Sequence, residues 1–258
     1  MSRASSIKAP GAMLLALEGR APWEFGAAIA AFPLLRCMPR GDGHAVVVFP
    51  GLAASDLSTL PLRAFLATRG YKPHGWELRF NFGPRAGVLE RSLERVRKLR
   101  RATGRKVSLV GWSLGGVYAR EIAKLAPEDV RCVITLGSPF TGHPRANNAW
   151  RVYEFASGHS LDDPVQLASV RKAPPVPTTS VFSRTDGIVA WPCCVQERGE
   201  LAESIEVSAS HIGMGMNPVT WYAVADRLSQ REGRWKPFHR EGWRKLLFND
   251  PYRARDPG

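Results

Sequence analysis

The stretch LVGWSLGGVYAR, residues 109–120, places Ser113 between Gly111 and Gly115 at a change of sequence pattern. An apolar run typical of a buried strand ends just before this serine, and apolar residues at helical spacing begin just after it. Two interpretations fit a serine at such a junction. It is either a nucleophile held on a sharp strand-to-helix turn or a plain residue at a helix start. The glycines around it and the preceding strand favour the nucleophile.

The rest of the chain continues this alternation of strands and helices. Short apolar runs bounded by turn residues predict buried strands at about 45–49, 74–80, 106–111, 130–140, 176–182 and 204–208. Helical patterns predict helices at 56–69, capped by Asp56 or Ser58, at 86–102, at 114–126, between the last two strands, and after the Asn217-Pro218 pair. This order predicts an α/β fold with a mostly parallel central sheet and helices on both faces.

The chain is expected to form a single domain over residues 1–258. Apolar residues at helical spacing indicate N-terminal helices at about 11–40, which either dock on the domain or lie on a membrane. The segment at about 141–175 lacks a strand pattern and is expected to be a small insertion. The segment at about 232–258 is a basic, aromatic tail that wraps the domain or stays partly mobile.

Composition restricts the class of protein. The net charge of +13 indicates a basic, solvated surface. A second hypothesis is that this surface is attracted to an anionic membrane. Spacings typical of nucleic-acid binding, a metal site or a nucleotide cofactor are not found, so none of these partners is expected. The cysteines are too few and too irregular for a disulfide framework, which favours a cytoplasmic protein: Cys37, Cys132, Cys193 and Cys194. No signal peptide or membrane-spanning stretch is expected.

With Ser113 on its strand-to-helix turn, residues 44–230 resemble the α/β-hydrolase family, and within it the bacterial lipases and carboxylesterases. The resemblance implies an acid and then a histidine, each after a late strand. Asp186 in SRTDGIV and His211 in SASHIGM have these positions. Asp162 and Asp163 are rival acids, but they fall within the insertion.

The resemblance also assigns roles. His211 would act as the general base for Ser113, and Asp186 would orient its imidazole. One oxyanion donor would be the backbone N–H of Leu114, and Leu52 is expected to supply the other, with Ala53 as the fallback. Gly111 and Gly115 would form the tight turn around the nucleophile.

These groups imply a serine hydrolase that cleaves small-molecule or lipid esters without a cofactor. In this family an insertion at 141–175 forms a cap, and apolar residues would line its underside: Trp150, Val152, Tyr153, Phe155, Leu161, Val165 and Leu167. Arg79 and Asn81, after the second strand, are hypothesised to support the pocket. Two alternatives stay open: a thioesterase or acyltransferase with the same triad, and a non-catalytic binding protein of this fold.

Overall fold

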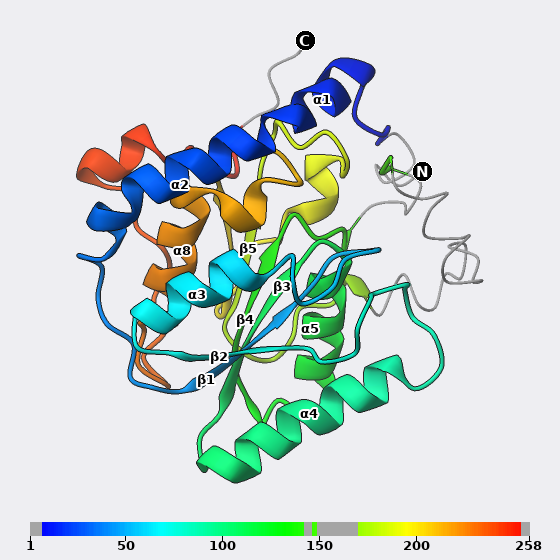
Figure 1. The fold of residues 1–258 in the computed structure, drawn as a ribbon, viewed down its shortest axis with the longest axis vertical. Coiled ribbons are helices and arrows are strands. Elements are labelled where there is room, and N and C mark those ends of the chain that lie inside the picture. The colour runs from blue at the N-terminus through cyan, green and yellow to red at the C-terminus, as the bar shows by residue number, and fades with distance from the viewer. Residues whose placement is uncertain (1–6, 142–145, 149–169, 254–258) are drawn as a thin grey trace.

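The computed structural model describes residues 7–141, 146–148 and 170–253, and its centre is one six-stranded sheet (Figure 1). The strands are β1 (Ala45–Phe49), β2 (Lys72–Gly75), β3 (Val107–Trp112), β4 (Val130–Leu136), β5 (Thr178–Phe182) and β6 (Ala202–Glu206). They lie in the order β2-β1-β3-β4-β5-β6, and every neighbouring pair is parallel. The parallel sheet predicted from the alternation of apolar strands and helices is therefore confirmed.

Helices cover both faces of the sheet. On one side lie α3 (Leu60–Thr68) and α8 (Pro218–Leu228), and on the other lie α4 (Val88–Thr103) and α5 (Leu114–Leu125) (Figure 1). Strands β1, β3 and β4 supply side chains to both layers, as in β1, where Val46 and Val48 face the first side and Val47 and Phe49 the second. This two-sided burial explains why these three strands read as continuous apolar runs.

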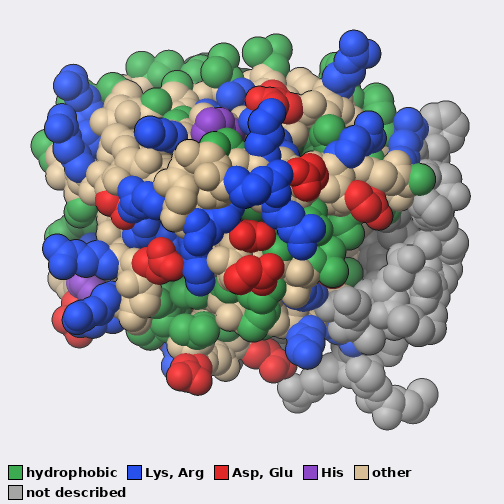
Figure 2. Space-filling view, turned by 90° about the horizontal axis from the view of Figure 1, so that it is seen from below, with side chains coloured by type: hydrophobic (Ala, Val, Ile, Leu, Met, Phe, Trp, Pro, Cys, Tyr) green, Lys and Arg blue, Asp and Glu red, His purple; other side chains and the backbone are tan. Residues whose placement is uncertain are grey.

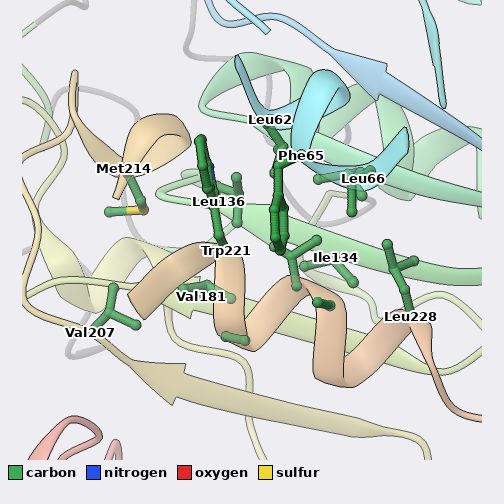
Figure 3. Close-up of a cluster of buried hydrophobic side chains, with 14 of the residues drawn as sticks. Leu62, Phe65, Leu66, Ile134, Leu136, Val181, Val207, Met214, Trp221 and Leu228 are labelled. Carbon is green, nitrogen blue, oxygen red and sulfur yellow. The ribbon is translucent and has the colours of Figure 1, made fainter. Parts of the chain in front are cut away.

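The layer formed by α3 and α8 closes through an aromatic pair. Phe65 of α3 stacks on Trp221 of α8 with ring centroids 5.0 Å apart, above Ile134 and Leu136 of the sheet (Figure 3). The side chain of Asn217 accepts hydrogen bonds from the N–H groups of Val219 and Thr220, as its place before a proline predicts. This cap fixes the start of α8 close to the loop that follows β6.

The N-terminal helices are α1 (Ala12–Ala16), the 3₁₀ helix η2 (Leu17–Arg20) and α2 (Ala21–Leu35), and they run along one end of the molecule (Figure 1). They dock on the domain, where Ala28 and Leu35 join the core beside α8. The described part of the tail includes the 3₁₀ helix η5 (Gly242–Leu246), after which Phe248 is buried in the same core. In the described ranges no helix is both long enough and apolar enough to cross a membrane.

Three details differ from the expectations. The helix expected at 56–69 begins only at Leu60, because the Asp56 carboxylate accepts hydrogen bonds from the N–H groups of Trp76 and Glu77 instead of capping a helix. Those bonds follow β2, which ends at Gly75 rather than near residue 80. Between β5 and β6 there is only a 3₁₀ helix, η3 (Trp191–Cys194), where a full helix was expected. The cap residues named above and the rival acids Asp162 and Asp163 lie outside the described residues.

Candidate active site

The candidate site lies at the carboxyl edge of the parallel sheet. Leu52 follows β1, Ser113 follows β3, Asp186 follows β5 and His211 follows β6. The chain passes from β1 outward to β2 and then returns to β3 on the other side of β1, so the strand order reverses between β1 and β3. Ligands of open parallel sheets bind in the crevice at such a reversal. Ser113 lies beside this crevice.

Ser113 has a strained backbone. Its φ of 53° and ψ of −124° lie outside the regions that residues with a side chain normally adopt. Two hydrogen bonds hold the turn. The N–H of Ser113 donates to the carbonyl oxygen of Leu136 at 2.8 Å, and the N–H of Gly116 donates to the carbonyl oxygen of Ser113 at 3.0 Å. Helix α5 starts at the next residue, so its N-terminal N–H groups and positive dipole end point toward the serine.

The turn around Ser113 has room only for glycine at three positions. A Cβ atom on Gly111 would lie 2.4 Å from the backbone of Gly116, and one on Gly115 would lie 2.4 Å from the carbonyl oxygen of Phe49. A Cβ atom on Gly116 would lie 2.0 Å from the hydroxyl of Ser138. These close approaches bring β1, β3 and α5 together beneath the serine.

Asp186 and His211 form a buried pair. The Asp186 Oδ2 atom and the His211 Nδ1 atom are 2.6 Å apart. The other carboxylate oxygen of Asp186 accepts the N–H groups of Ile188 and Val189 at 2.8 and 2.7 Å, which fixes the orientation of the carboxylate. Gly137 packs against the pair, since a Cβ atom there would lie 3.1 Å from the His211 ring. Asp186, fixed by these backbone N–H groups, therefore holds the His211 imidazole in one orientation.

Opposing influences set the pKa of His211. Burial of the imidazole acts to lower its pKa by penalising the charged form. The charge of Asp186, its hydrogen bond to the ring and the charge of Glu18 act in the opposite direction and outweigh burial. The pKa of His211 is therefore raised above its ordinary value of 6.5. A base of this kind is poised to accept a proton near neutral pH.

The histidine loop lies beside the serine turn. The indole N–H of Trp112, the residue before Ser113, donates to the carbonyl oxygen of His211 at 3.0 Å. The Ser113 hydroxyl makes no hydrogen bond with any described residue. Asp186 and His211 are therefore hydrogen-bonded to each other, whereas His211 and Ser113 are not. Such bonds are often long before a substrate binds.

The loop after β1 lies against the serine turn, because a Cβ atom on Gly51 would lie 3.3 Å from the Ser113 Cβ atom. Within the described chain the N–H groups of Leu52 and Leu114 donate no hydrogen bond to the protein. Ala53, the fallback donor, is different, because its N–H already donates to the carbonyl oxygen of Asn81 at 2.7 Å. Leu52 and Leu114 thus keep free donors, and Ala53 does not.

Asn81 supports this loop. Its buried amide donates to the carbonyl oxygen of Pro50 at 2.8 Å and accepts the N–H of Gly83 at 3.1 Å. Its backbone N–H also donates to the carbonyl oxygen of Ala54. Arg79, by contrast, contributes its carbonyl oxygen to the Trp76 indole and has a strained φ of 63°.

We expect Asn81→Ala to lower kcat by about tenfold with little change in KM, because a looser loop would move the Leu52 N–H from its position. The loss should be smaller than the 10²–10³-fold typical of deleting an oxyanion donor. Steady-state ester kinetics would measure it. Gln196→Ala is the matched control, since it removes another buried amide, one that accepts a hydrogen bond from Arg120. An Asn81→Ala variant as active as this control would contradict the role.

A buried carboxylate missed by the sequence reasoning joins the two catalytic loops. Glu18 of η2 is 5% exposed. One of its oxygens accepts the N–H groups of Gly187 and His211 at 2.7 and 2.8 Å, and the other accepts the N–H of Ile212 at 2.8 Å. Glu18 thereby ties the residue after the acid to the histidine and its neighbour.

Two further N-terminal residues add to this attachment. Arg20 donates to the hydroxyl and carbonyl oxygens of Thr185 at 2.7 and 3.0 Å. Glu24 accepts the N–H of Ser210 at 2.7 Å and the amide of Asn217 at 3.2 Å. Residues 11–35 contain no other charged residue, and this sparse pattern in an apolar segment is the signal that could have revealed the contacts.

A second set of serine, histidine and aspartate lies at the opposite edge of the sheet. His44 contacts the Ser108 hydroxyl through Nε2 at 2.8 Å and Asp42 through Nδ1 at 2.5 Å. Ser108 and His44 are fully buried, and Arg131 also contacts both Asp42 and His44. Burial lowers the pKa of His44, with the cations around it adding to that effect. A substrate cannot reach this serine, so the set is structural.

The adjacent cysteines near the acid loop are packing residues. Cys193 and Cys194 are buried with Phe182 and Val189, and none of the four cysteines forms a disulfide. Burial raises the pKa of the Cys194 thiol well above its ordinary value, so it stays protonated and unreactive.

Comparisons with known proteins bear on the fold. No protein-family model and no curated protein matches the sequence. Among solved structures, lipase B of Aspergillus fumigatus is similar, with 15% sequence identity and a TM-score of 0.59 over 75% of this chain and 54% of that one. A Bacillus licheniformis lipase matches with 16% identity and a TM-score of 0.55 over 74% of this chain and 94% of that chain.

A monoacylglycerol lipase of Paleococcus ferrophilus gives a similar result, with 14% identity and a TM-score of 0.51 over 74% of this chain and 96% of its own. The chain therefore spans about half of the first of these lipases and nearly all of the other two. Likeness at such low identity concerns the fold alone. The chain has the α/β-hydrolase fold that the serine turn indicated.

Proposed function

We propose that this protein is a serine hydrolase that cleaves carboxylic esters. The observation that carries the proposal is the buried Asp186–His211 hydrogen bond placed beside a strained serine turn at the carboxyl edge of the sheet. The free N–H groups of Leu52 and Leu114 beside the same serine add support, because a developing oxyanion needs such donors.

The reaction proceeds in two halves. The Ser113 hydroxyl attacks the ester carbonyl carbon while His211 Nε2 takes its proton, and Leu52 and Leu114 bind the resulting oxyanion. The C–O bond to the alcohol breaks, and His211 returns the proton to the departing oxygen. Water then attacks the acyl carbon while His211 accepts a proton from it. The bond between the acyl carbon and Ser113 Oγ breaks, His211 returns the proton to that oxygen, and the carboxylic acid leaves. Asp186 holds the imidazole and stabilises its charged form throughout.

An apolar acyl or alcohol portion fits the surroundings of the site. Phe80 and Phe82, on the loop after β2, are exposed and stack with ring centroids 5.8 Å apart. Ile212, directly after His211, is also exposed. These side chains flank Asn81 and His211 at the edge where substrate would approach, which favours lipid or other apolar esters.

The test is hydrolysis of p-nitrophenyl esters from acetate to palmitate, combined with labelling by a fluorophosphonate. We expect turnover of at least one chain length and a single covalent adduct on Ser113, located by peptide mass spectrometry. Turnover of thioesters alone would assign the same groups to a thioesterase. Absence of both turnover and adduct would contradict the proposal and favour a non-catalytic binding protein.

A further inference from the structure

The outer face of the N-terminal helices is apolar throughout. Every exposed residue from 11 to 34 is Gly, Ala, Pro, Met, Leu, Ile or Trp. Trp23 is 80% exposed and Leu34 is 77% exposed. The exposed large side chains form what is here called the apolar face: Met13, Leu15, Leu17, Trp23, Ile29 and Leu34. A soluble surface rarely leaves so continuous an apolar area in water without a partner.

The tail extends the apolar face. A groove of about 590 Å³ lies between α2, α8 and η5, and Leu34 and Trp243 both line it. Three large apolar side chains at η5 and directly after it are exposed, with Leu246 at 86%: Trp243, Leu246 and Leu247. In Figure 1 this C-terminal segment, in red, lies next to α2. The two exposed apolar groups thus belong to one surface.

The exposed charges next to the apolar face in the sequence have one sign, whereas at η5 both Lys245 and Glu241 are exposed. The charged side chains exposed between residues 7 and 40 are Lys8, Arg36 and Arg40, which are all basic. The two acids of this segment, Glu18 and Glu24, point inward to the catalytic loops. The end of the molecule that carries α4 differs, because there Lys and Arg are interspersed with Asp and Glu (Figure 2).

We propose that the apolar face and η5 dock this protein on an anionic lipid surface. Exposed apolar side chains, with Trp23 among them, are stabilised by burial in the interfacial region of a membrane, and Lys8, Arg36 and Arg40 beside them favour anionic lipid. A protein partner would require polar groups at the rim of its contact, and the apolar face offers none between residues 11 and 34. The docked helices place the histidine loop next to the lipid, since Ile212 is bonded to Glu18 on the inner side of the same segment.

The test is sedimentation of the full chain with vesicles of phosphatidylcholine alone or mixed with phosphatidylglycerol. We expect binding to the anionic vesicles, and we expect the double variant Trp23→Gln, Leu34→Gln to weaken it by about tenfold or more. Leu125→Gln is the matched control, because Leu125 is exposed at the opposite end of α5. Arg40→Glu should weaken binding to anionic vesicles more than Lys98→Glu on α4 does.

Hydrolysis of a water-soluble ester should be unchanged in the double variant, which separates this inference from the proposed function. Equal binding of the double variant and the Leu125→Gln control would overturn the proposal, as would no binding of the wild type to anionic vesicles. Analytical ultracentrifugation adds one more outcome. A dimer that the double variant dissociates would assign the apolar face to a second copy of the chain and would likewise overturn lipid docking.

Discussion

Replacing Ser113 by alanine is expected to lower ester turnover by about 10⁴–10⁶-fold. The proposed mechanism forms its covalent bond at this hydroxyl, and neither His211 nor the free N–H groups can supply a substitute nucleophile. The free energy of unfolding should change little, because the hydroxyl makes no hydrogen bond with the described protein and the strained turn stays the same. Steady-state kinetics and thermal unfolding of the same preparation would measure both quantities.

The chain contains its own matched control in Ser108. Ser108→Ala also removes a serine that contacts a histidine paired with an aspartate. It should leave turnover within a few-fold of the wild type and cost about 1–3 kcal/mol of stability, because His44 and Cys132 lose a buried partner. Activity retained in Ser113→Ala, or lost specifically in Ser108→Ala, would place the reaction elsewhere.

Replacing Glu18 by alanine is expected to lower stability by several kcal/mol and to abolish most activity. Its carboxylate is the acceptor for the N–H groups of Gly187, His211 and Ile212, and each buried donor left without a partner costs about 1–3 kcal/mol. The loops that carry Asp186 and His211 would lose their common attachment. Chemical denaturation and ester kinetics would measure the two effects.

Glu18→Gln separates positioning from simple stability. Glutamine keeps the shape but removes the charge that helps to raise the pKa of His211. Since catalysis needs the neutral imidazole, activity falls as the pH drops through the pKa of His211, and this acid limb should lie above pH 6.5 in the wild type. In Glu18→Gln the limb should move to lower pH.

The control for this shift is Glu203→Gln. Glu203 is another buried carboxylate, and it accepts hydrogen bonds from Thr179, Arg227 and the N–H of Phe238. It lies near the start of β6, whereas the histidine loop follows the end of that strand. The Glu203→Gln substitution should lower the free energy of unfolding without moving the acid limb of the pH–activity profile. An acid limb that is unchanged in Glu18→Gln would reduce Glu18 to a purely structural residue.

Local patterns allowed much of the fold to be predicted. The central strands β1, β3 and β4 are apolar on both faces, and the start of α8 is capped by Asn217 before a proline, so each signal lies within a few residues of the element it predicts. The positions of Ser113, Asp186 and His211 were expected because each follows a recognisable strand. Whether the three act together in catalysis remains a prediction for the experiments above.

What the sequence could not provide depends on contacts between distant residues. Glu18 lies 193 positions before His211. The few charged residues in an apolar segment mark Glu18 as unusual, but no local pattern identifies the N–H groups that it binds. The carboxylate of Asp56 likewise reaches across 20 positions to Trp76, which removes it from the helix start that its local sequence suggested. The helix expected before β6 is reduced to η3, because the carbonyl oxygens of Pro192 and Cys193 accept hydrogen bonds from the distant segment at 140–141 instead of continuing a helix.

The inward orientation of Glu18, Arg20 and Glu24 has a consequence for how this protein can change. Their side chains bind the loops that carry Asp186 and His211, while the opposite side of the same helices holds no charge. The two sides can therefore be altered independently. Substitutions on the apolar face would change what the proposed docking surface binds. The contacts of Glu18, Arg20 and Glu24 with the loops of Asp186 and His211 would stay the same.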